Sequence, residues 1–242
     1  MRRLFLRRTL AALGIAAGTL CVPGFSAAAT PEQRELVIAV GGQGLFYYLP
    51  LAIAQQRGYF SAEGLEVEIA DFPGGAKSLQ ALIGGSAAFA AGAFEHVLNM
   101  QAKGQDVQAV TLMARYPGMV LALPAGAGAA WRSPADLKGL KVGVTAPGSS
   151  THMFLNHVLK GAGLRAEEVA VIGVGAGASA IAAMRRGEID ALVHLDPVIH
   201  QLEAAGAIDI VLDTRTEQGA RAVYGGTYHA SCLYAKAAYI RD

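Results

Sequence analysis

A cluster of hydroxyl side chains stands where a predicted strand gives way to a predicted helix. The segment Pro147-Gly-Ser-Ser-Thr151-His brings Ser149, Ser150, Thr151 and then His152 to the first turn of that helix. Free N–H groups and the positive end of the helix dipole attract anions there, and the hydroxyls add further donors. The pattern suits a sulfonate, a nitrate or a carboxylate. The alternative is an ordinary helix cap, because serine and threonine are preferred at that position anyway.

Polar residues also follow predicted buried strands at two corresponding places. Glu95 and His96 follow the strand predicted at 87–91, and His194 and Asp196 follow the one predicted at 189–193. In open α/β sheets the ligand binds at the carboxyl ends of the strands, so these four side chains are cleft candidates by position. The alternative is that Glu95 and Asp196 simply cap the helices that they precede.

A glycine-rich turn follows the first predicted strand. Gly41-Gly-Gln43-Gly44 could suggest a dinucleotide-binding loop, but Tyr47 stands where the third glycine of that fingerprint is required. We interpret the segment as a close-approach turn at the lip of a cleft. Tyr47 or Tyr48 would then offer a ring face and a hydroxyl to a ligand.

The remaining reactive side chains do not form a metal site or a nucleophilic site. His152 and His157 are five positions apart and His194 and His200 are six apart, so no pair has the spacing of two helical metal ligands. The Gly-x-Ser-x-Gly pattern of a serine nucleophile is also missing. We therefore expect no metal, no cofactor and no catalytic residue, and we do not expect an enzyme.

The elements that hold these residues occur twice along the chain. Residues 75–90 resemble residues 177–192 in having a glycine start, a helical stripe, a glycine stop and an apolar run, and residues 36–40 resemble 140–144. Repeats of about a hundred residues do not fit a solenoid, whose units are shorter. The pattern predicts two similar α/β lobes, and a cleft between two lobes is a common place for a small ligand.

Apolar periodicity predicts the elements of each lobe. Strands are expected at 36–40, 65–70, 87–91, 107–114, 119–123, 141–144, 170–172, 189–193, 208–212 and 228–234. Helices are expected at 45–57, 75–83, 93–103, 150–161, 178–186 and 196–205, with a helical turn at 134–139. The glycine- and alanine-rich residues 124–133 suggest a linker or a loose loop. Alternation of strands and helices predicts parallel sheets.

The first 29 residues have the order of a secretory signal peptide. Four arginines within residues 1–8 precede an uncharged apolar run at 9–22 and small residues at 25–29. The run is shorter than the roughly 20 residues of a membrane span, so we expect cleavage near Ala29 and a periplasmic protein. Arg7-Arg8 leaves twin-arginine export open beside the general route.

Removing that segment changes the charge and the cysteine count. The remaining chain carries 16 Lys and Arg against 19 Asp and Glu, without a basic stripe, so no nucleic-acid partner is expected. Only Cys232 would remain, which excludes an intrachain disulfide. The lobes must therefore be held by their apolar cores.

One long segment resembles a known family. Tyr48-Leu-Pro-Leu-Ala-Ile-Ala-Gln-Gln-Arg-Gly58-Tyr-Phe-Ser-Ala-Glu-Gly64-Leu-Glu-Val is similar to the signature of the nitrate/sulfonate/taurine-type periplasmic solute-binding proteins of ABC importers. Residues 137–144, 147–150 and 187–191 are also similar to that family, and the resemblance covers nearly all of the mature chain. The family shares its domain with thiamine-pyrimidine precursor synthases.

The resemblance implies a type II periplasmic-binding-protein fold that closes around one small ligand and docks on a membrane permease. It implies that the cleft is lined by the first-strand loop with Gln43, the Gly74-Gly75 turn, the third-strand loop and the helix start at Ser149-Ser150. The chain would cross between the lobes near 121–126 and 214–226. We expect lobe one at 30–123 plus 224–242, lobe two at 124–223, and a monomer.

Two departures from the family accompany the resemblance. Ala88 stands where an acidic residue is usual before the third strand. Family members also continue for several helices beyond the position of Asp242, so the C-terminal helices of lobe one are expected to be missing.

The sequence thus predicts an exported substrate-binding protein that captures a small organic anion for an ABC importer. An amine-bearing or heteroaromatic ligand such as a pyrimidine is the alternative, since the aromatic lip with Glu95 and Asp196 would suit it. A synthase of the thiamine-pyrimidine kind would use iron and a cysteine-rich motif that this chain lacks. A ligand-sensing module is a further alternative.

Overall fold

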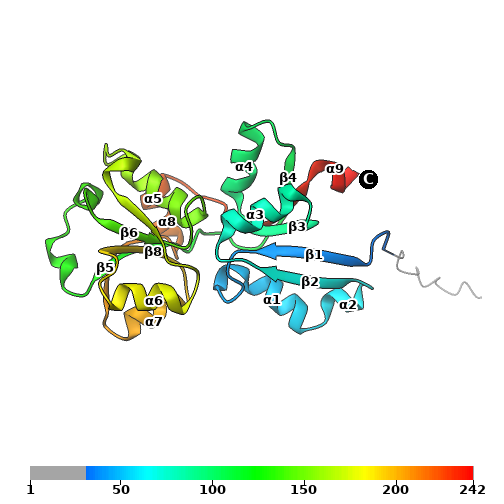
Figure 1. The fold of residues 1–242 in the computed structure, drawn as a ribbon, viewed down its shortest axis with the longest axis horizontal. Helices are drawn as coiled ribbons and strands as arrows, with labels where there is room; N and C mark the ends of the chain where they lie inside the picture. The colour runs from blue at the N-terminus through cyan, green and yellow to red at the C-terminus, as the bar shows by residue number, and fades with distance from the viewer. Residues whose placement is uncertain (1–30, 242) are drawn as a thin grey trace, which may run out of the picture. The chain divides into compact units, whose positions relative to one another are not determined.

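Two five-stranded sheets organise the part of the chain that the computed structural model describes, residues 31–241. Each sheet carries helices on both faces and forms one α/β lobe (Figure 1). The predicted signal peptide at 1–29 lies outside the described residues. None of the helices within residues 31–241 has the length and hydropathy that crossing a membrane requires.

Lobe one contains the beginning and the end of the described chain. Its strands lie in the order β2 (Glu66–Asp71), β1 (Glu35–Val40), β3 (Phe89–Ala93), β10 (Ser231–Lys236) and β4 (Val107–Leu112). Its helical segments are η1 (Phe46–Tyr48), α1 (Leu49–Gln56), α2 (Tyr59–Ala62), α3 (Gly75–Gly84), α4 (Phe94–Ala102) and α9 (Ala237–Arg241). The central strand β3 consists mostly of small residues, with the sequence Phe-Ala-Ala-Gly-Ala.

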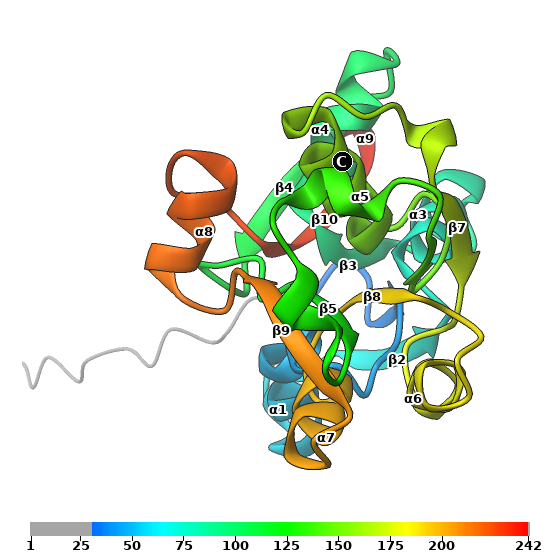
Figure 2. The same cartoon turned by 90° about the vertical axis from the view of Figure 1, so that its left-hand side faces the viewer.

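Lobe two is built on the second sheet. Its strands lie in the order β7 (Ala170–Gly173), β6 (Lys141–Val144), β8 (Ala191–His194), β5 (Val120–Pro124) and β9 (Ile208–Asp213). Its helical segments are η2 (Ala127–Ala130), η3 (Pro134–Leu137), α5 (Ser150–Gly161), η4 (Ala166–Glu168), α6 (Ala178–Arg185), α7 (Val198–Ala204) and α8 (Glu217–Tyr224). Helix α8, in orange, stands at one side of this lobe (Figure 2).

Both sheets are mixed, so the prediction of parallel sheets is wrong for one strand in each. β10 runs antiparallel to β3 and β4, and β5 runs antiparallel to β8 and β9. The remaining pairs are parallel. β5 and β10 are the two strands that enter a sheet directly from the other lobe. Two parallel strands of one sheet are joined by a crossover connection, usually a helix. Neither β5 nor β10 follows such a helix from another strand of its own sheet.

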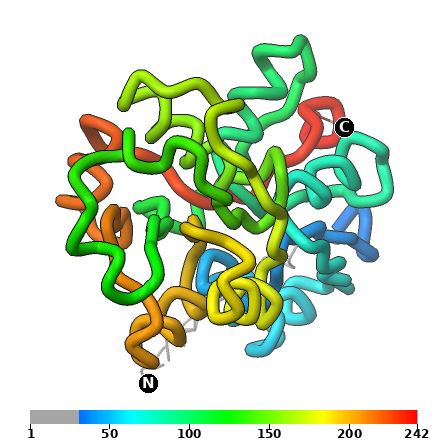
Figure 3. The backbone as a smooth tube through the Cα atoms, turned by 60° about the vertical axis from the view of Figure 1, so that its left-hand side comes forward, coloured from blue at the N-terminus to red at the C-terminus, as the bar shows by residue number. Residues whose placement is uncertain are grey.

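The chain passes between the lobes along two segments that lie side by side. The first lies between β4 and β5 and the second between α8 and β10, and the chain can be followed through the second from orange to red (Figure 3). The N–H of Met113 donates to the carbonyl of Ser231 at 2.8 Å, which joins the two segments. β5 belongs to the second sheet and begins at Val120. The first crossing therefore ends before Val120, whereas lobe two was expected to begin at residue 124.

Residues 124–133 form part of lobe two instead of the predicted linker. One carboxylate oxygen of Asp209 on β9 accepts hydrogen bonds from the N–H groups of Gly126 and Gly128, at 2.8 and 2.9 Å. A Cβ at Gly128 would lie 2.7 Å from the Cβ of Asp209, so only glycine permits this approach. The glycine content therefore reflects close packing rather than looseness.

Candidate ligand-binding site

The start of α3 in lobe one contacts the start of α5 in lobe two. The N–H of Ala76 donates a hydrogen bond to Ser149 Oγ at 3.0 Å. A Cβ at Gly74 would lie 2.9 Å from both Ala146 Cβ and Ser149 Oγ, so the missing side chain permits the contact. Gly75 is just as confined, because its Cβ would lie 3.0 Å from His96 Nε2. Four predicted site residues thus gather around this contact.

A second contact joins the first-strand loop of lobe one to lobe two. The N–H of Phe46 donates to the carbonyl of Asp196 at 3.0 Å. Gly42 approaches so closely that a Cβ there would lie 2.3 Å from Ala176 Cβ. Contacts of this kind hold the two lobes together, as they would in a closed binding protein.

The first-strand loop itself is held within lobe one. The N–H of Gly41 donates to Tyr48 Oη at 3.2 Å. Asp71 Oδ1 accepts the N–H groups of Gly42 and Gln43, at 2.9 and 2.8 Å. The side-chain amide of Gln43 reaches only Gln55, at 3.5 Å. Tyr48 and Gln43 thus shape the loop.

The predicted anion donors at the start of α5 also accept hydrogen bonds from the protein. Thr151 Oγ1 accepts the N–H of Thr145 at 3.0 Å and shares a hydrogen bond with the Thr145 hydroxyl at 2.8 Å. His152 Nδ1 accepts the N–H of Gly148 at 2.9 Å. Ser149 Oγ accepts the N–H of Ala76, so its own hydroxyl hydrogen remains for an anion, together with the side chain of Ser150 and backbone N–H groups.

His194 and Asp196 at the end of β8 also have protein partners. The two ring nitrogens of His194 lie 3.0 Å from the carbonyl of Gly175 and 3.2 Å from that of Leu195. Burial lowers the pKa of His194. Asp196 Oδ1 accepts the N–H of His200 at 2.9 Å, as a helix cap does, and Oδ2 lies 3.6 Å from Arg215 Nη1.

Glu95 differs from these residues, because part of its carboxyl group has no protein partner. It lies in the first turn of α4. The residue is half-buried, but Oε2 is closed off from solvent and has no hydrogen-bond partner among the described residues. Burial raises the pKa of Glu95 to about 7, although its backbone N–H and the Tyr228 hydroxyl favour the ionised form.

Tyrosines from both lobes surround this carboxyl group. Tyr47 on η1 is 7% exposed, and its hydroxyl has no partner within the described part of the chain. The hydroxyl of Tyr224 at the end of α8 is also buried without a partner. Burial raises the pKa of both tyrosines, and the negative charge of Glu95 raises each further. The three groups therefore lie close enough to interact.

An aromatic stack positions the tyrosines contributed by the second crossing. The rings of Tyr224 and Tyr228 lie parallel with centroids 4.3 Å apart. On its other side Tyr224 stacks on His157 of α5 at 4.8 Å. The stack ties the crossing to lobe two and brings the Tyr228 hydroxyl toward Glu95 of lobe one.

His96 extends the cluster into the core of lobe one. Its ring centroid lies 6.4 Å from that of Tyr234 on β10, and its Nε2 is buried without a partner among the described residues. Burial lowers the pKa of His96 to about 4, so the ring is neutral near pH 7. Buried polar atoms without partners are rare in native proteins, and a group of them marks a place where a ligand or water completes the contacts.

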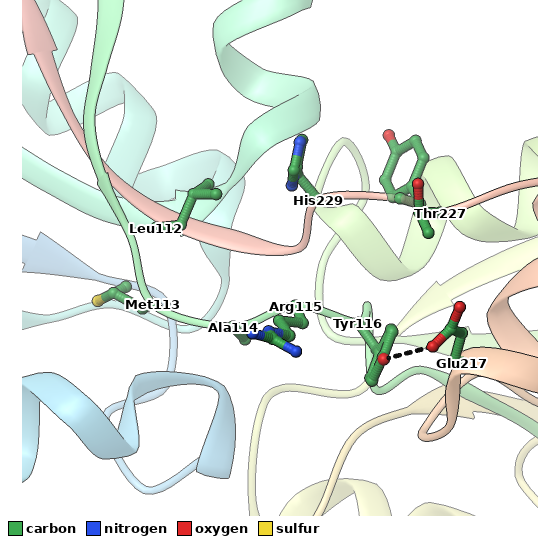
Figure 4. A pocket seen from close by; sticks show the side chains of 9 residues that line it. Leu112, Met113, Ala114, Arg115, Tyr116, Glu217, Thr227 and His229 are labelled. Carbon is green, nitrogen blue, oxygen red and sulfur yellow. Dashed lines mark hydrogen bonds between the residues drawn. The ribbon is translucent and has the colours of Figure 1, made fainter.

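Two cavities reach the tyrosines of this cluster. A cavity of about 560 Å³ runs along the crossing segments, where Tyr116 donates a hydrogen bond to Glu217 at 3.1 Å (Figure 4). Tyr228 also lines this cavity. A second cavity of about 210 Å³ is lined by Tyr47, Asp196 and Arg215 among others. The first lies within the size range of small-molecule sites.

Sequence reasoning did not single out Tyr224, Tyr228 or Tyr234. They stand at or beside the predicted second crossing, and three tyrosines within eleven residues of a crossing were a signal that could have been used. Among the described residues there is no group of three or more histidine, cysteine, aspartate or glutamate side chains that could hold a metal ion.

Known proteins resemble this chain in sequence and in structure. The NMT1/THI5 like family model matches residues 46–241, whereas no curated protein matches the chain. A solved structure from Bordetella bronchiseptica RB50 is 50% identical with a TM-score of 0.83, and the match covers 86% of this chain and 66% of that one. The chain therefore spans slightly less than two thirds of the length of that relative.

Two more distant structures show the fold. One is the alkanesulfonate-binding protein SsuA from Xanthomonas axonopodis pv. citri bound to MOPS, at 24% identity and a TM-score of 0.64, covering 87% of this chain and 68% of that one. The other is the periplasmic nitrate-binding protein NrtA from Synechocystis PCC 6803, at 16% identity and a TM-score of 0.67, covering 88% and 58%. The two lobes have the type II periplasmic-binding-protein fold.

Proposed function

The chain belongs to the NMT1/THI5-like family, and from this premise we propose that it captures a small organic solute between its lobes for an ABC importer. One observation carries the proposal. A carboxyl oxygen and two tyrosine hydroxyls, drawn from both lobes, are closed off from solvent without protein partners. A ligand held there would satisfy groups that are costly to leave unpaired.

Closure of the lobes would supply the mechanism. Glu95 and Tyr47 belong to lobe one, whereas Tyr224 belongs to α8 and packs on α5 of lobe two. Only a closed state places all three around one ligand, so a ligand would stabilise that state over an open one. A permease that accepts the closed form would then receive the loaded protein. Export to the periplasm and docking on a permease are parts of this proposal.

An organic anion is one of two candidate ligand classes. The relatives named for alkanesulfonate and nitrate support it, and so does the start of α5, where backbone N–H groups and Ser150 remain. An amine-bearing or heteroaromatic ligand is the second class. Glu95 favours it, because an ionised carboxylate accepts hydrogen bonds from N–H donors and cannot donate any.

Binding without turnover is the activity that we propose. The relatives named above are described as binding proteins, and the chain lacks the cysteine-rich motif expected of the thiamine-pyrimidine synthases. A sensor would bind its ligand in the same way, so transport has to be tested with the permease.

A thermal-melting panel tests the proposal. The chain without residues 1–29 is melted alone and with alkanesulfonates, nitrate, aromatic carboxylates and nitrogen heterocycles, and each solute is recovered and analysed for product. A ligand at a hundred times its dissociation constant should add about 2.7 kcal/mol to the free energy of unfolding. A cooperative melt that no solute moves would contradict solute capture, and a converted solute would contradict binding without turnover.

A further inference from the structure

We propose that Glu95 makes this site selective for a ligand that carries a positively charged, N–H-bearing planar group, rather than for a simple anion. The inference rests on the proposed solute capture and names the ligand class for the same site. It starts from a carboxyl group whose Oε2 is enclosed between two lobes and that forms no ion pair within the described residues.

Among the described residues, the groups whose pKa the charge of Glu95 raises are uncharged near neutral pH. They come from η1, α8, the second crossing and β10, and they are Tyr47, Tyr224, Tyr228, Cys232 and Tyr234. Burial keeps the pKa of each phenol and of the thiol high, so none is an anion, and none can become a cation. His96, next along α4, is neutral because burial holds its pKa at about 4.

Within residues 31–241, Glu95 therefore has hydroxyl dipoles near it but no ion-pair partner. An isolated buried carboxylate is costly and takes up a proton unless a positive charge is brought to it. The pKa of about 7 reflects this cost. A bound ammonium, amidinium or protonated heterocycle would supply the charge through short charge-assisted hydrogen bonds. An anion at the same place would add a second negative charge.

The ring of Tyr228 suits a flat cation. The stack covers only one face of Tyr228, on the Tyr224 side, whereas both faces of Tyr224 are covered, by Tyr228 and His157. Tyr47 meets Tyr48 edge to face, with ring centroids 5.5 Å apart. Aromatic faces attract cations by about 0.5–2 kcal/mol, and more strongly where water is excluded. The helix dipole favours an acidic residue in the first turn of α4, so it explains why a glutamate stands there. It does not explain why Oε2 of that glutamate lacks a partner.

The experiment compares three probes of nearly the same shape and different charge. Benzamidine is a cation, benzamide is neutral and benzoate is an anion, and the first and last keep their charges from pH 6 to pH 8. Methanesulfonate and nitrate are added as simple anions. Dissociation constants are measured by calorimetry at both pH values for the chain without residues 1–29, for Glu95→Gln and for Glu63→Gln. Glu63 is exposed, so its amide variant is the matched control.

We expect benzamidine to bind more tightly than benzamide and benzoate. Its affinity should be about tenfold weaker at pH 6 than at pH 8, because at pH 6 a group with a pKa of about 7 must first lose its proton. Glu95→Gln should weaken benzamidine on the order of 30-fold or more and should leave benzoate unchanged or tighter. Glu63→Gln should bind all probes as the parent does.

Three outcomes overturn the inference in distinguishable ways. If methanesulfonate, nitrate or benzoate binds and benzamidine does not, solute capture stands and the selectivity is wrong. If benzamidine binds equally to the parent and to Glu95→Gln, with the melt of the variant intact, Glu95 is not the selective group. If none of the five probes binds a chain that melts cooperatively, the inference fails, whereas solute capture is decided by the wider melting panel.

Discussion

Glu95 gives the folded protein a carboxyl group that keeps its proton to higher pH than the unfolded chain does. Burial raises its pKa from the ordinary 4.5 to about 7. Between these values the folded state binds more protons, so the free energy of unfolding falls as the pH rises. Glu95→Gln removes this loss and should raise the free energy of unfolding at pH 8 by roughly 1–3 kcal/mol, with no gain below pH 4.5. Urea denaturation of both proteins at pH 8 and below pH 4.5 measures the change in the free energy of unfolding. Equal gains at both pH values would contradict the raised pKa of Glu95.

His96 acts on stability in the opposite direction. Burial lowers its pKa from 6.5 to about 4, so between these values the unfolded state binds more protons and acid destabilises the fold. In the parent chain Glu95 partly offsets this between pH 6.5 and 4.5. We therefore expect the free energy of unfolding of Glu95→Gln to fall more steeply than that of the parent over this window. Parallel curves for the two proteins would show that Glu95 does not titrate there.

Of the residues in the proposed site, the sequence singled out Glu95 and Tyr47 but not Tyr224 and Tyr228. Glu95 and Tyr47 follow the ends of predicted strands, and that position alone brings them to the region between the lobes. Ser149 and Thr151 have the residue type of anion ligands, but sequence does not tell whether a hydroxyl is already bonded to another segment. Tyr224 and Tyr228 depend on how α8 packs against α5, which no local pattern encodes.

At the scale of elements, the loop after β1 packs directly on the start of α3. A Cβ at Gly41 would lie 2.2 Å from the backbone nitrogen of Gly75, so the backbone would have to move. Gly41→Ala should lower the free energy of unfolding by about 1–3 kcal/mol. Gly44 lies in the same loop with nothing within 4 Å of its Cβ position, and Gly44→Ala should stay within about 0.5 kcal/mol of the parent. Denaturant titration of the two variants measures both free energies of unfolding. Similar losses in the two variants would contradict the close approach of Gly41 to Gly75.

Periodicity identified most elements but not the direction of two strands. The helix at α5 and the strand at β6 have the predicted bounds, because their apolar spacing is set by their own contacts with one sheet. The antiparallel direction of β5 and β10 depends on where the chain crosses between lobes, and a strand's own residues do not specify that. Helix α8 was missed because it has only eight residues and Gly219 lies in its first turn.

At the scale of the whole molecule, the repeat predicted two lobes but not the contact between them. Gly75 and Gly177 stand at corresponding places in the repeat, at the starts of α3 and α6. The residues that precede them differ, since Gly74 faces Ala146 and Ser149 whereas Ala176 faces Gly42. The contact therefore joins unlike positions of the two copies, and comparing the copies with each other cannot reveal it.

Gly74 offers a way to disturb closure without disturbing either lobe. The atoms nearest to its Cβ position belong to Ala146 and Ser149 of the other lobe, at 2.9 Å, which is closer than real Cβ contacts. Its backbone is extended, with φ −180° and ψ 164°, so alanine is not strained there. Gly74→Ala should therefore fold normally but disfavour the closed state, which lowers ligand affinity by the same factor.

We expect Gly74→Ala to bind the solute found in the melting panel about tenfold or more weakly. Its radius of gyration in solution scattering should exceed that of the parent when solute is present at a concentration that closes the parent. Gly177→Ala is the matched control, because nothing lies within 4 Å of its Cβ position, and it should match the parent in both measurements. If Gly74→Ala binds and closes as Gly177→Ala does, the contact between α3 and α5 is not part of the bound state, and the ligand must be held by an arrangement of the lobes other than this one.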